Sequence, residues 1–322
     1  MEVLQKLETR AAGATTWPPS VTPDLAMLRI GFVNVFLYGR PGAPSGSWVL
    51  IDAGLPGSAS RITRAARQWI GPWAQPGAII LTHGHFDHVG ALRSLTDVWD
   101  VPVYAHPLEL PYLTGRSAYP PPDPTVGGGA MATLSRFYPR GPINFGDRIR
   151  ALPDDGSVPG MPGWRWIHTP GHAPGHVSLF RDEDRTLIAG DAFVTTKQES
   201  ALSAVTYNPE MHGPPAYFTP DWTASRRSVE RLAALEPERV VTGHGPLLSG
   251  PQMREDLHRL AREFERLAVP AHGRYVGRPA ITDARGVVSV PPPVPDPLPR
   301  FLLAAGLGLL LATAIRRSTR TG

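Results

Sequence analysis

Residues 82–90 read THGHFDHVG, which places His83, His85, Asp87 and His88 within six positions. The stretch directly follows an apolar run at 78–81 that predicts a short buried strand. Histidine and aspartate side chains cost free energy when they are buried without partners. A divalent metal ion provides such a partner, and zinc prefers imidazole nitrogen and carboxylate oxygen where no thiolate is present. Because the chain has no cysteine, the stretch predicts a His/Asp metal site at the end of a strand.

The spacing within this stretch predicts two metal ions. His83 and His85 are two positions apart, so in an extended loop their side chains point the same way and can bind one ion together. Asp87 and His88 lie where the chain turns into the next predicted helix, which directs them toward a second ion. Two ligands are too few for either ion, so we expect further ligands elsewhere in the chain.

Three other short motifs supply candidates for these missing ligands. Residues 169–176 read TPGHAPGH and place His172 and His176 on a Pro/Gly-rich turn after a predicted strand. Asp191 in AGD (189–191) and His244 in TGHG (242–245) each follow another apolar run. His or Asp beside Gly is common in turns, so each motif alone is weak evidence. Together they predict side chains that converge on one edge of a sheet.

In this order the motifs resemble the five-motif pattern of the metallo-β-lactamase superfamily, over roughly residues 25–267. The resemblance implies an α/β protein with a four-layer αβ/βα sandwich and a site at the edge between its two sheets. It also implies two divalent metal ions, with zinc the expected metal. The implied ligands are His83, His85 and His172 for the first ion, Asp87, His88 and His244 for the second, and Asp191 between both. Asp52, in IDAG (51–54), matches a position that supports the ligands, and His176 matches one that hydrogen-bonds a ligand.

Other residues rank the branches of this superfamily. The commonest class of true β-lactamases uses a Cys and lacks the bridging Asp, whereas this chain has Asp191 and no Cys. The C-terminal segment of glutathione-thioester hydrolases is not found. Lactone-cleaving relatives often carry a Tyr three residues after the bridging Asp, where this chain has Val194, although Tyr207 could reach in as a substrate contact. The pattern looks most like the uncharacterised bacterial metallo-hydrolases of the glyoxalase II and lactonase-like branch.

The resemblance implies a hydrolase in which a hydroxide bridging two zinc ions attacks a carbonyl ester, thioester or lactone. Asp87 and Asp191 would take or relay the proton while they remain ligands. Two irregular segments, 111–142 and 195–220, would form the substrate walls. Their candidate contacts are Tyr112, Tyr119, Phe137, Tyr138, Tyr207, Tyr217 and Phe218, for which simple loop packing is the alternative. The alternative functions are an iron-dependent oxidoreductase of the same fold and a phosphodiesterase.

Periodicity predicts the secondary structure outside the motifs. Strands are predicted at 25–38, 48–51, 78–81, 101–104, 164–168, 177–181, 186–189 and 240–241, and helices at 58–70, 89–98, 223–235 and 252–267. The strand–helix alternation is typical of an α/β protein. These elements form a predicted hydrolase domain at 1–269, followed by a Pro-rich linker at 270–299 and a hydrophobic tail helix with a basic end at 300–322.

Composition and the two ends of the chain predict its partners. The 32 Lys and Arg residues are scattered and nearly balanced by 28 Asp and Glu residues, so we expect a small-molecule substrate and no nucleic acid. Residues 1–10 lack the hydrophobic segment of a signal peptide, which predicts a cytoplasmic protein. Residues 301–315 are continuously apolar or small. As a helix they would rise about 22 Å against a hydrocarbon core of about 30 Å. We expect this tail to contact a membrane, and docking on the domain or on a partner chain is the alternative.

Overall fold

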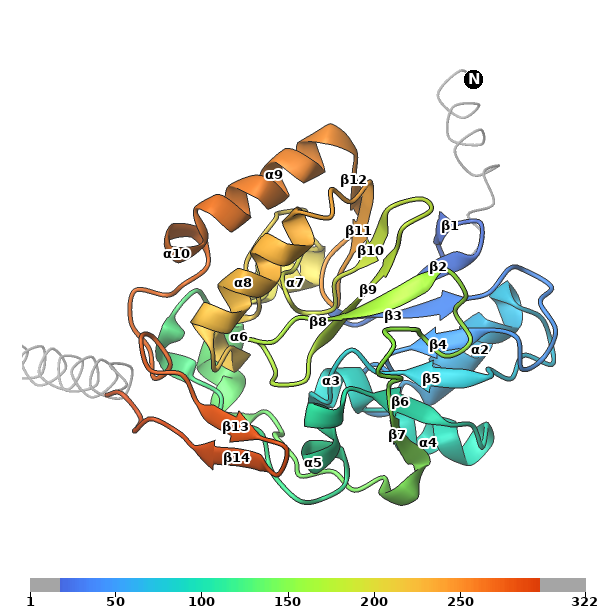
Figure 1. The fold of residues 1–322 in the computed structure, drawn as a ribbon, viewed down its shortest axis with the longest axis horizontal. Coiled ribbons are helices and arrows are strands. Elements are labelled where there is room, and N and C mark those ends of the chain that lie inside the picture. The colour runs from blue at the N-terminus through green and yellow to red at the C-terminus, as the bar shows by residue number, and fades with distance from the viewer. Residues whose placement is uncertain (1–17, 296–322) are drawn as a thin grey trace, which may run out of the picture.

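The first β-sheet of the computed structural model, which describes residues 18–295, has seven strands in chain order (Figure 1). They are β1 (Ser20–Thr22), β2 (Leu25–Ile30), β3 (Val33–Tyr38), β4 (Val49–Ile51), β5 (Ala78–Ile80), β6 (Val103–Ala105) and β7 (Ile149–Ala151). Strands β1 to β4 pair antiparallel, and β4 to β7 pair parallel. The carboxyl ends of β4, β5 and β6 therefore lie at the same edge of the sheet.

The second sheet has five strands within the described residues, in the order β12-β11-β10-β9-β8. They are β8 (Trp164–His168), β9 (Val177–Arg181), β10 (Thr186–Ile188), β11 (Arg239–Val241) and β12 (Leu248–Ser249). Strands β10 and β11 are parallel, and the other neighbours are antiparallel. A separate hairpin consists of β13 (Ile281–Asp283) and β14 (Gly286–Ser289).

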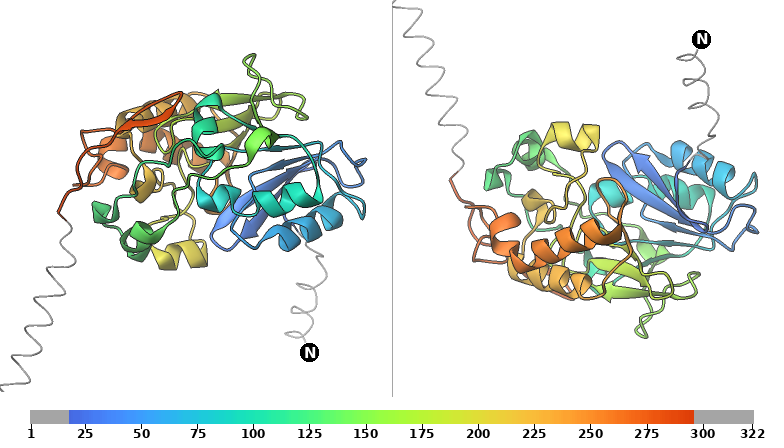
Figure 2. Two further views of the ribbon diagram at one scale, coloured as in Figure 1. Left: turned by 90° about the horizontal axis from the view of Figure 1, so that it is seen from below. Right: turned by 90° about the horizontal axis from the view of Figure 1, so that it is seen from above.

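Helices cover the outer face of each sheet. Helices α2 (Ala59–Trp69) and α4 (Leu92–Val98) pack on the first sheet, and α8 (Trp222–Ala233) and α9 (Gly250–Arg262) pack on the second. The shorter helices are α3 (Phe86–Val89), α5 (Leu110–Leu113), α6 (Ala130–Leu134), α7 (Ala201–Thr206) and α10 (Phe264–Leu267), with 3₁₀ turns η1 (Pro107–Glu109), η2 (Pro124–Val126), η3 (Ser135–Phe137), η4 (Gly146–Arg148) and η5 (Ala216–Phe218). Figure 2 shows α6 and α7 side by side in both views, and a backbone hydrogen bond of 3.1 Å from Met131 N of α6 to the carbonyl oxygen of Glu199, shortly before α7, joins them.

Alternation along the strands explains the layers. In β3, Val35 and Leu37 face α2 and α4, whereas Phe36 faces the second sheet. In β9, Phe180 faces α8 and α9, whereas Leu179 faces the first sheet. Hydrophobic side chains therefore fill three successive spaces, one under each pair of helices and one between the sheets. The predicted four-layer αβ/βα sandwich is confirmed.

The C-terminal part differs from the prediction in one respect. The hairpin β13–β14 lies inside the predicted linker at 270–299, and Val287 of β14 packs on Tyr112, Tyr119 and Ala173. The hairpin was not predicted because its strands are short and because the proline-dense residues 291–299 directly after it indicated an extended linker. The division into segments at 269 and 299 stays a prediction, and the hydrophobic tail at 300–322 lies outside the described residues. Between residues 18 and 295, no helix has both the length and the apolar character needed to cross a membrane.

Candidate metal centre

The predicted ligands lie at the edge of the sandwich where strands of both sheets end. From the first sheet, His83 and His85 follow β5, and Asp87 and His88 belong to α3 directly after them. From the second sheet, the predicted ligands are His172 in the β8–β9 loop, Asp191 after β10 and His244 after β11. All seven side chains are buried. The fold thus brings together residues that are more than 150 positions apart in the sequence.

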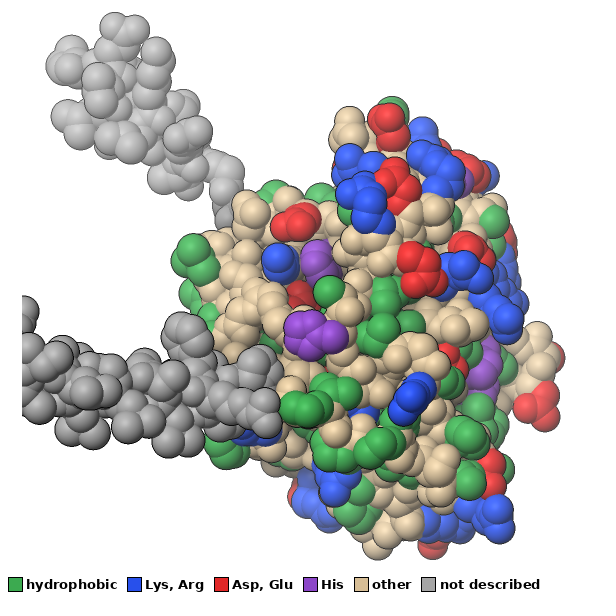
Figure 3. Space-filling view, turned by 90° about the vertical axis from the view of Figure 1, so that its left-hand side faces the viewer, with side chains coloured by type: hydrophobic (Ala, Val, Ile, Leu, Met, Phe, Trp, Pro, Cys, Tyr) green, Lys and Arg blue, Asp and Glu red, His purple; other side chains and the backbone are tan. Residues whose placement is uncertain are grey.

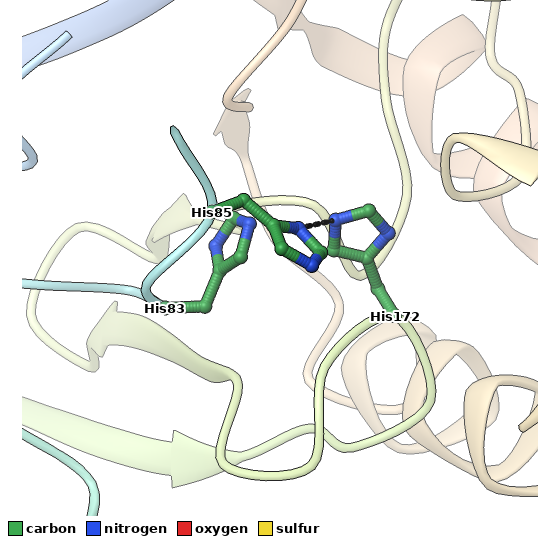
Figure 4. Close-up of side chains that lie close together, drawn as sticks. All are labelled: His83, His85 and His172. Atoms are coloured by element: carbon green, nitrogen blue, oxygen red, sulfur yellow. Dashed lines mark hydrogen bonds between the residues drawn. The ribbon is translucent and has the colours of Figure 1, made fainter. Parts of the chain in front are cut away.

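His83, His85 and His172 form the first cluster, and their ligand atoms lie within 4.8 Å of one another. Figure 4 shows the three imidazoles facing one another, with His85 Nδ1 2.9 Å from His172 Nε2. The rings of His83 and His85 are nearly perpendicular, with centroids 4.6 Å apart. Three imidazoles at this separation can converge on one ion.

Asp87, His88 and His244 form the second cluster, again with ligand atoms within 4.8 Å. Asp191 lies between the two clusters. Its Oδ2 is 3.1 Å from His244 Nε2, 3.6 Å from His88 Nε2 and 3.4 Å from His172 Nε2. One carboxylate oxygen therefore reaches the imidazoles of both clusters.

Asp52 contacts the predicted ligand His88, and His176 contacts the predicted ligand Asp191. Asp52 accepts a hydrogen bond from Thr82 N and from Thr82 Oγ1, and its Oδ2 lies 2.8 Å from His88 Nδ1. Its φ of 60° is unusual for a residue other than glycine, which shows that these contacts overcome backbone strain. His176 Nε2 accepts a hydrogen bond of 2.8 Å from Asp191 N. Its Nδ1 therefore carries the proton and donates to Thr169 Oγ1.

Burial and neighbouring charges set the protonation of the site. Burial and the imidazoles of His88 and His85 lower the pKa of His83 well below its ordinary value, which keeps the ring neutral. Burial alone would raise the pKa of Asp191, but the imidazoles of His244 and His88 outweigh it and hold this pKa well below its usual range. For these two residues, the neutral imidazole and the ionised carboxylate are the forms that bind metal. Burial alone would lower the pKa of His88, but the carboxylates of Asp191 and Asp52 outweigh it and raise this pKa well above its ordinary value, so a metal ion bound there would displace a proton.

Unpaired polar atoms show that the residues fit a metal ion. Among the described residues, four of the buried polar atoms without a hydrogen-bond partner belong to predicted ligands, namely His83 Nε2, His88 Nε2, His172 Nδ1 and Asp191 Oδ1. Such atoms cost about 1–3 kcal/mol each when nothing binds them. Their concentration at one place is expected where side chains are arranged to bind cations.

Glu109 is part of the site but was not predicted from the sequence. It is 0 % exposed and lies in η1, shortly after β6 ends at the same sheet edge. Its Oε2 accepts hydrogen bonds from Gly84 N (2.9 Å) and from the hydroxyl of Tyr119, and its Oε1 accepts one from Gly175 N (2.7 Å). Gly84 separates His83 from His85, and Gly175 precedes His176. Glu109 therefore connects the two loops that carry the first cluster.

A small pocket adjoins the first cluster. It is lined by His85, Tyr119, Pro120, Pro121, His172, Phe218, Pro220 and Tyr275, and it has a volume of about 10 Å³. Tyr119 and Phe218 are among the aromatic residues predicted as substrate walls, and both rings contact the His85 ring. Tyr275 was missed because it lies in the predicted linker, where a lone aromatic residue carries no motif.

Tyr207, the predicted substrate contact, lies at the end of α7. Its hydroxyl donates to Asn34 Oδ1, and the guanidinium of Arg29 lies 3.8 Å from its ring centroid. Asn34 Nδ2 in turn donates to the carbonyl oxygens of Thr242 and Gly245, on either side of His244. Tyr207 is thus joined to the His244 loop, and its contact with substrate stays a prediction.

Gly243→Ala should disrupt the centre without changing its ligands. A Cβ at Gly243 would lie 2.0 Å from Asp191 Oδ1 and 2.7 Å from His88 Cε1, so both side chains would have to move. We expect a loss of stability of about 1–3 kcal/mol from overpacking. We also expect fewer than two bound metal ions per chain by elemental analysis.

Gly42→Ala is the matched control for this substitution. Gly42 has a φ of +79° and no atom within 4 Å of an added Cβ, so alanine there strains the backbone in open space. It should cost stability but leave the metal content intact. Full metal content in Gly243→Ala would contradict the close packing of Gly243 on Asp191.

Comparisons with known proteins agree with this geometry. Residues 28–244 match the sequence model of the family described as the metallo-beta-lactamase superfamily. The probable metallo-hydrolase YflN of Bacillus subtilis is 49% identical over 237 residues, which cover 74% of this chain and 89% of that protein. The probable metallo-hydrolase YybB of the same bacterium is 29% identical over 196 residues, covering 61% of this chain and 74% of that protein.

Solved structures show the same fold. A beta-lactamase domain protein from Burkholderia ambifaria aligns with a TM-score of 0.53 at 19% identity, covering 79% of this chain and 80% of that chain. A metallo-beta-lactamase family protein from Thermus thermophilus aligns with a TM-score of 0.51 at 22% identity, covering 76% of this chain and 81% of that chain.

Proposed function

The chain belongs to the metallo-beta-lactamase superfamily, and from that premise we propose that it is a hydrolase that binds two zinc ions. The position of Asp191 supports this proposal best, because its Oδ2 lies within 3.6 Å of imidazole nitrogens from both clusters. A single ion would need only one cluster. The proposed ligands are His83, His85 and His172 for one ion, Asp87, His88 and His244 for the other, and Asp191 for both.

The chain's own side chains would prepare the reaction. Bound zinc would supply a water of lowered pKa and polarise the carbonyl group that is attacked. We assign the carboxylates of Asp87 and Asp191 to take a proton from the attacking water and to return it to the leaving alkoxide or thiolate when the carbon–oxygen or carbon–sulfur bond breaks. Asp52, His176 and Glu109 would keep the ligands in place through the hydrogen bonds described above. The rings of Tyr119 and Phe218 would exclude bulk water on the side of His85.

We propose a carbonyl ester, thioester or lactone as the substrate. The pocket beside His85 and His172 is lined by aromatic and proline side chains, and no Lys or Arg is among its lining residues. A phosphodiester carries negative charge at the scissile group, which cationic side chains beside the metal ions would help to bind. An uncharged carbonyl group fits this lining better.

A hydrolysis panel tests this function. The protein is stripped of metal, rebuilt with zinc or iron in separate samples, and assayed on a lactone, a thioester, an aryl ester, a β-lactam and a phosphodiester. We expect turnover of one of the first three classes that depends on zinc and disappears with chelator. Turnover of the phosphodiester alone, or of any substrate with iron alone, would contradict the proposal.

A further inference from the structure

A second and larger pocket adjoins the small pocket beside His85. Its volume is about 360 Å³, and it is lined by residues 121–125, Arg136, Tyr138, Arg140, Arg274, Pro293 and Val294. It shares Pro121 with the small pocket beside His85, and Arg274 directly precedes Tyr275 of that pocket. Figure 3 shows this face of the molecule, with basic side chains near the place where the described residues end. The two pockets are therefore neighbours at one side of the site.

The sizes of the two pockets indicate which part of a substrate each pocket would hold. The small pocket, of about 10 Å³, has room for about one water molecule. It can hold little more than the reacting group. The larger pocket falls within the range of about 300–1,000 Å³ that is usual for small-molecule sites. The rest of a substrate would therefore extend past Pro121 into the larger pocket.

Basic side chains outnumber acidic ones in the lining of the larger pocket. Three guanidinium groups line it, and Asp123 supplies the carboxylate among its lining residues. Asp123 is buried, and its oxygens already accept hydrogen bonds from Thr125 N, Thr125 Oγ1 and Arg274 N. The carboxylate of Asp123 therefore connects the loop at Thr125 to the loop at Arg274, and it is not paired with a guanidinium group.

Two of the arginines are available to a ligand. Within residues 18–295, no carboxylate forms an ion pair with Arg140 or Arg274. Arg140 Nη1 makes one long contact of 3.5 Å with the carbonyl oxygen of Tyr119, and the Arg274 guanidinium lies 6.0 Å from the Tyr275 ring centroid. Guanidinium groups bind carboxylate and phosphate through paired hydrogen bonds. Neutral ligands gain little from this arrangement.

We propose that the pocket lined by Arg136, Arg140 and Arg274 binds an anionic end of the substrate, a carboxylate or a phosphate. The substrate class is then an ester or thioester with its scissile carbonyl beside His85 and an oxyanion several bonds away. Pro121, Pro122 and Tyr138 provide an apolar wall for the part that connects the two ends. This inference rests on the proposed hydrolase function, because it extends the substrate of the same site.

Matched pairs of substrates test the inference. One pair is 4-nitrophenyl butyrate and mono-4-nitrophenyl glutarate, which differ by a terminal carboxylate. The other is S-acetyl-pantetheine and S-acetyl-4′-phosphopantetheine, which differ by a terminal phosphate. For the preferred anion, kcat/KM should exceed that of its neutral partner. Arg140→Ala and Arg274→Ala should each lower this ratio about 10-fold, as expected for a charge-assisted hydrogen bond. The pair that shows the effect identifies the anion.

Arg278→Ala is the matched control. Arg278 is exposed on the same turn as Arg274 but does not line the pocket, so the ratio should not change. Equal changes in the ratio for all three variants, or no preference for either anion in the unaltered protein, would overturn the inference.

Direct binding separates this inference from the proposed function. Glutarate and inorganic phosphate are titrated calorimetrically into the metal-loaded protein and into Arg140→Ala and Arg274→Ala. Weaker binding by both variants would support the anion pocket even if none of the esters is hydrolysed, in which case only the proposed reaction fails. Equal affinities in all three proteins, or no binding at all, would overturn the pocket itself.

Discussion

Asp191→Asn is expected to lower the hydrolytic activity at least about 100-fold and to leave fewer than two metal ions bound per chain. Groups that only support a ligand already contribute about 10–100-fold to metal affinity or activity. Asp191 Oδ2 lies between both clusters, 3.1 Å from His244 Nε2 and 3.4 Å from His172 Nε2, so its loss should cost more. Asparagine has nearly the same shape, and the difference therefore reports the charge and the second carboxylate oxygen.

Metal content and thermal stability measure this effect together. Metal that binds only the folded chain raises its melting temperature by mass action. This rise should be clearly smaller in Asp191→Asn than in the unaltered protein. Asp182→Asn is a suitable control, because Asp182 directly follows the carboxyl end of β9 and pairs with Arg165 at 2.9 Å on the surface. Two tightly bound ions in Asp191→Asn, with activity retained, would refute a centre in which Asp191 serves both ions.

The sequence predicts the ordered part of the fold because its signals are local. Strands such as Trp164–His168 and Val177–Arg181 were predicted with their correct bounds, and helix 58–70 differs by one residue at each end from α2. Each is an apolar pattern bounded by Pro, Gly or charged residues. The predicted helix at 89–98 corresponds to α4 and begins three residues too early, because Val89 is the last residue of α3 and Gly90 and Ala91 separate the two helices.

The candidate metal centre was predictable for a different reason. His83, His85 and His88 lie close together in the sequence, and His172 and His244 each stand in a short Gly-containing motif. Glu109 has no such context, because a lone Glu between Leu residues is compatible with an exposed helix position. Its role arises from tertiary packing, which brings Gly84 and Gly175 to its two oxygens. Tyr275 was missed for the same reason.

Glu109→Gln is expected to weaken metal binding about 10- to 100-fold, the range seen for groups that orient ligands. Glutamine keeps the volume of the side chain but turns one carboxylate oxygen into an N–H donor. That donor must face Gly175 N or the group of donors at Gly84 N and Tyr119, so one buried hydrogen bond is lost. The loss should destabilise the fold by about 1–3 kcal/mol. It should also loosen the His83–His85 loop relative to the His172 loop.

Glu199→Leu distinguishes positioning from simple stability, because it removes the acceptor of one buried backbone N–H. Glu199 is also buried, and its Oε1 accepts a hydrogen bond of 2.7 Å from Ala216 N. Unlike Glu109, it does not connect the two loops that carry His83, His85 and His172. Denaturant unfolding should show similar losses of stability for the two variants. Competition with a zinc chelator should show weaker metal binding only for Glu109→Gln. If both variants bind zinc equally well, Glu109 stabilises the fold without positioning the ligands. Weaker binding in Glu109→Gln alone would establish that the two histidine loops depend on one carboxylate for their alignment.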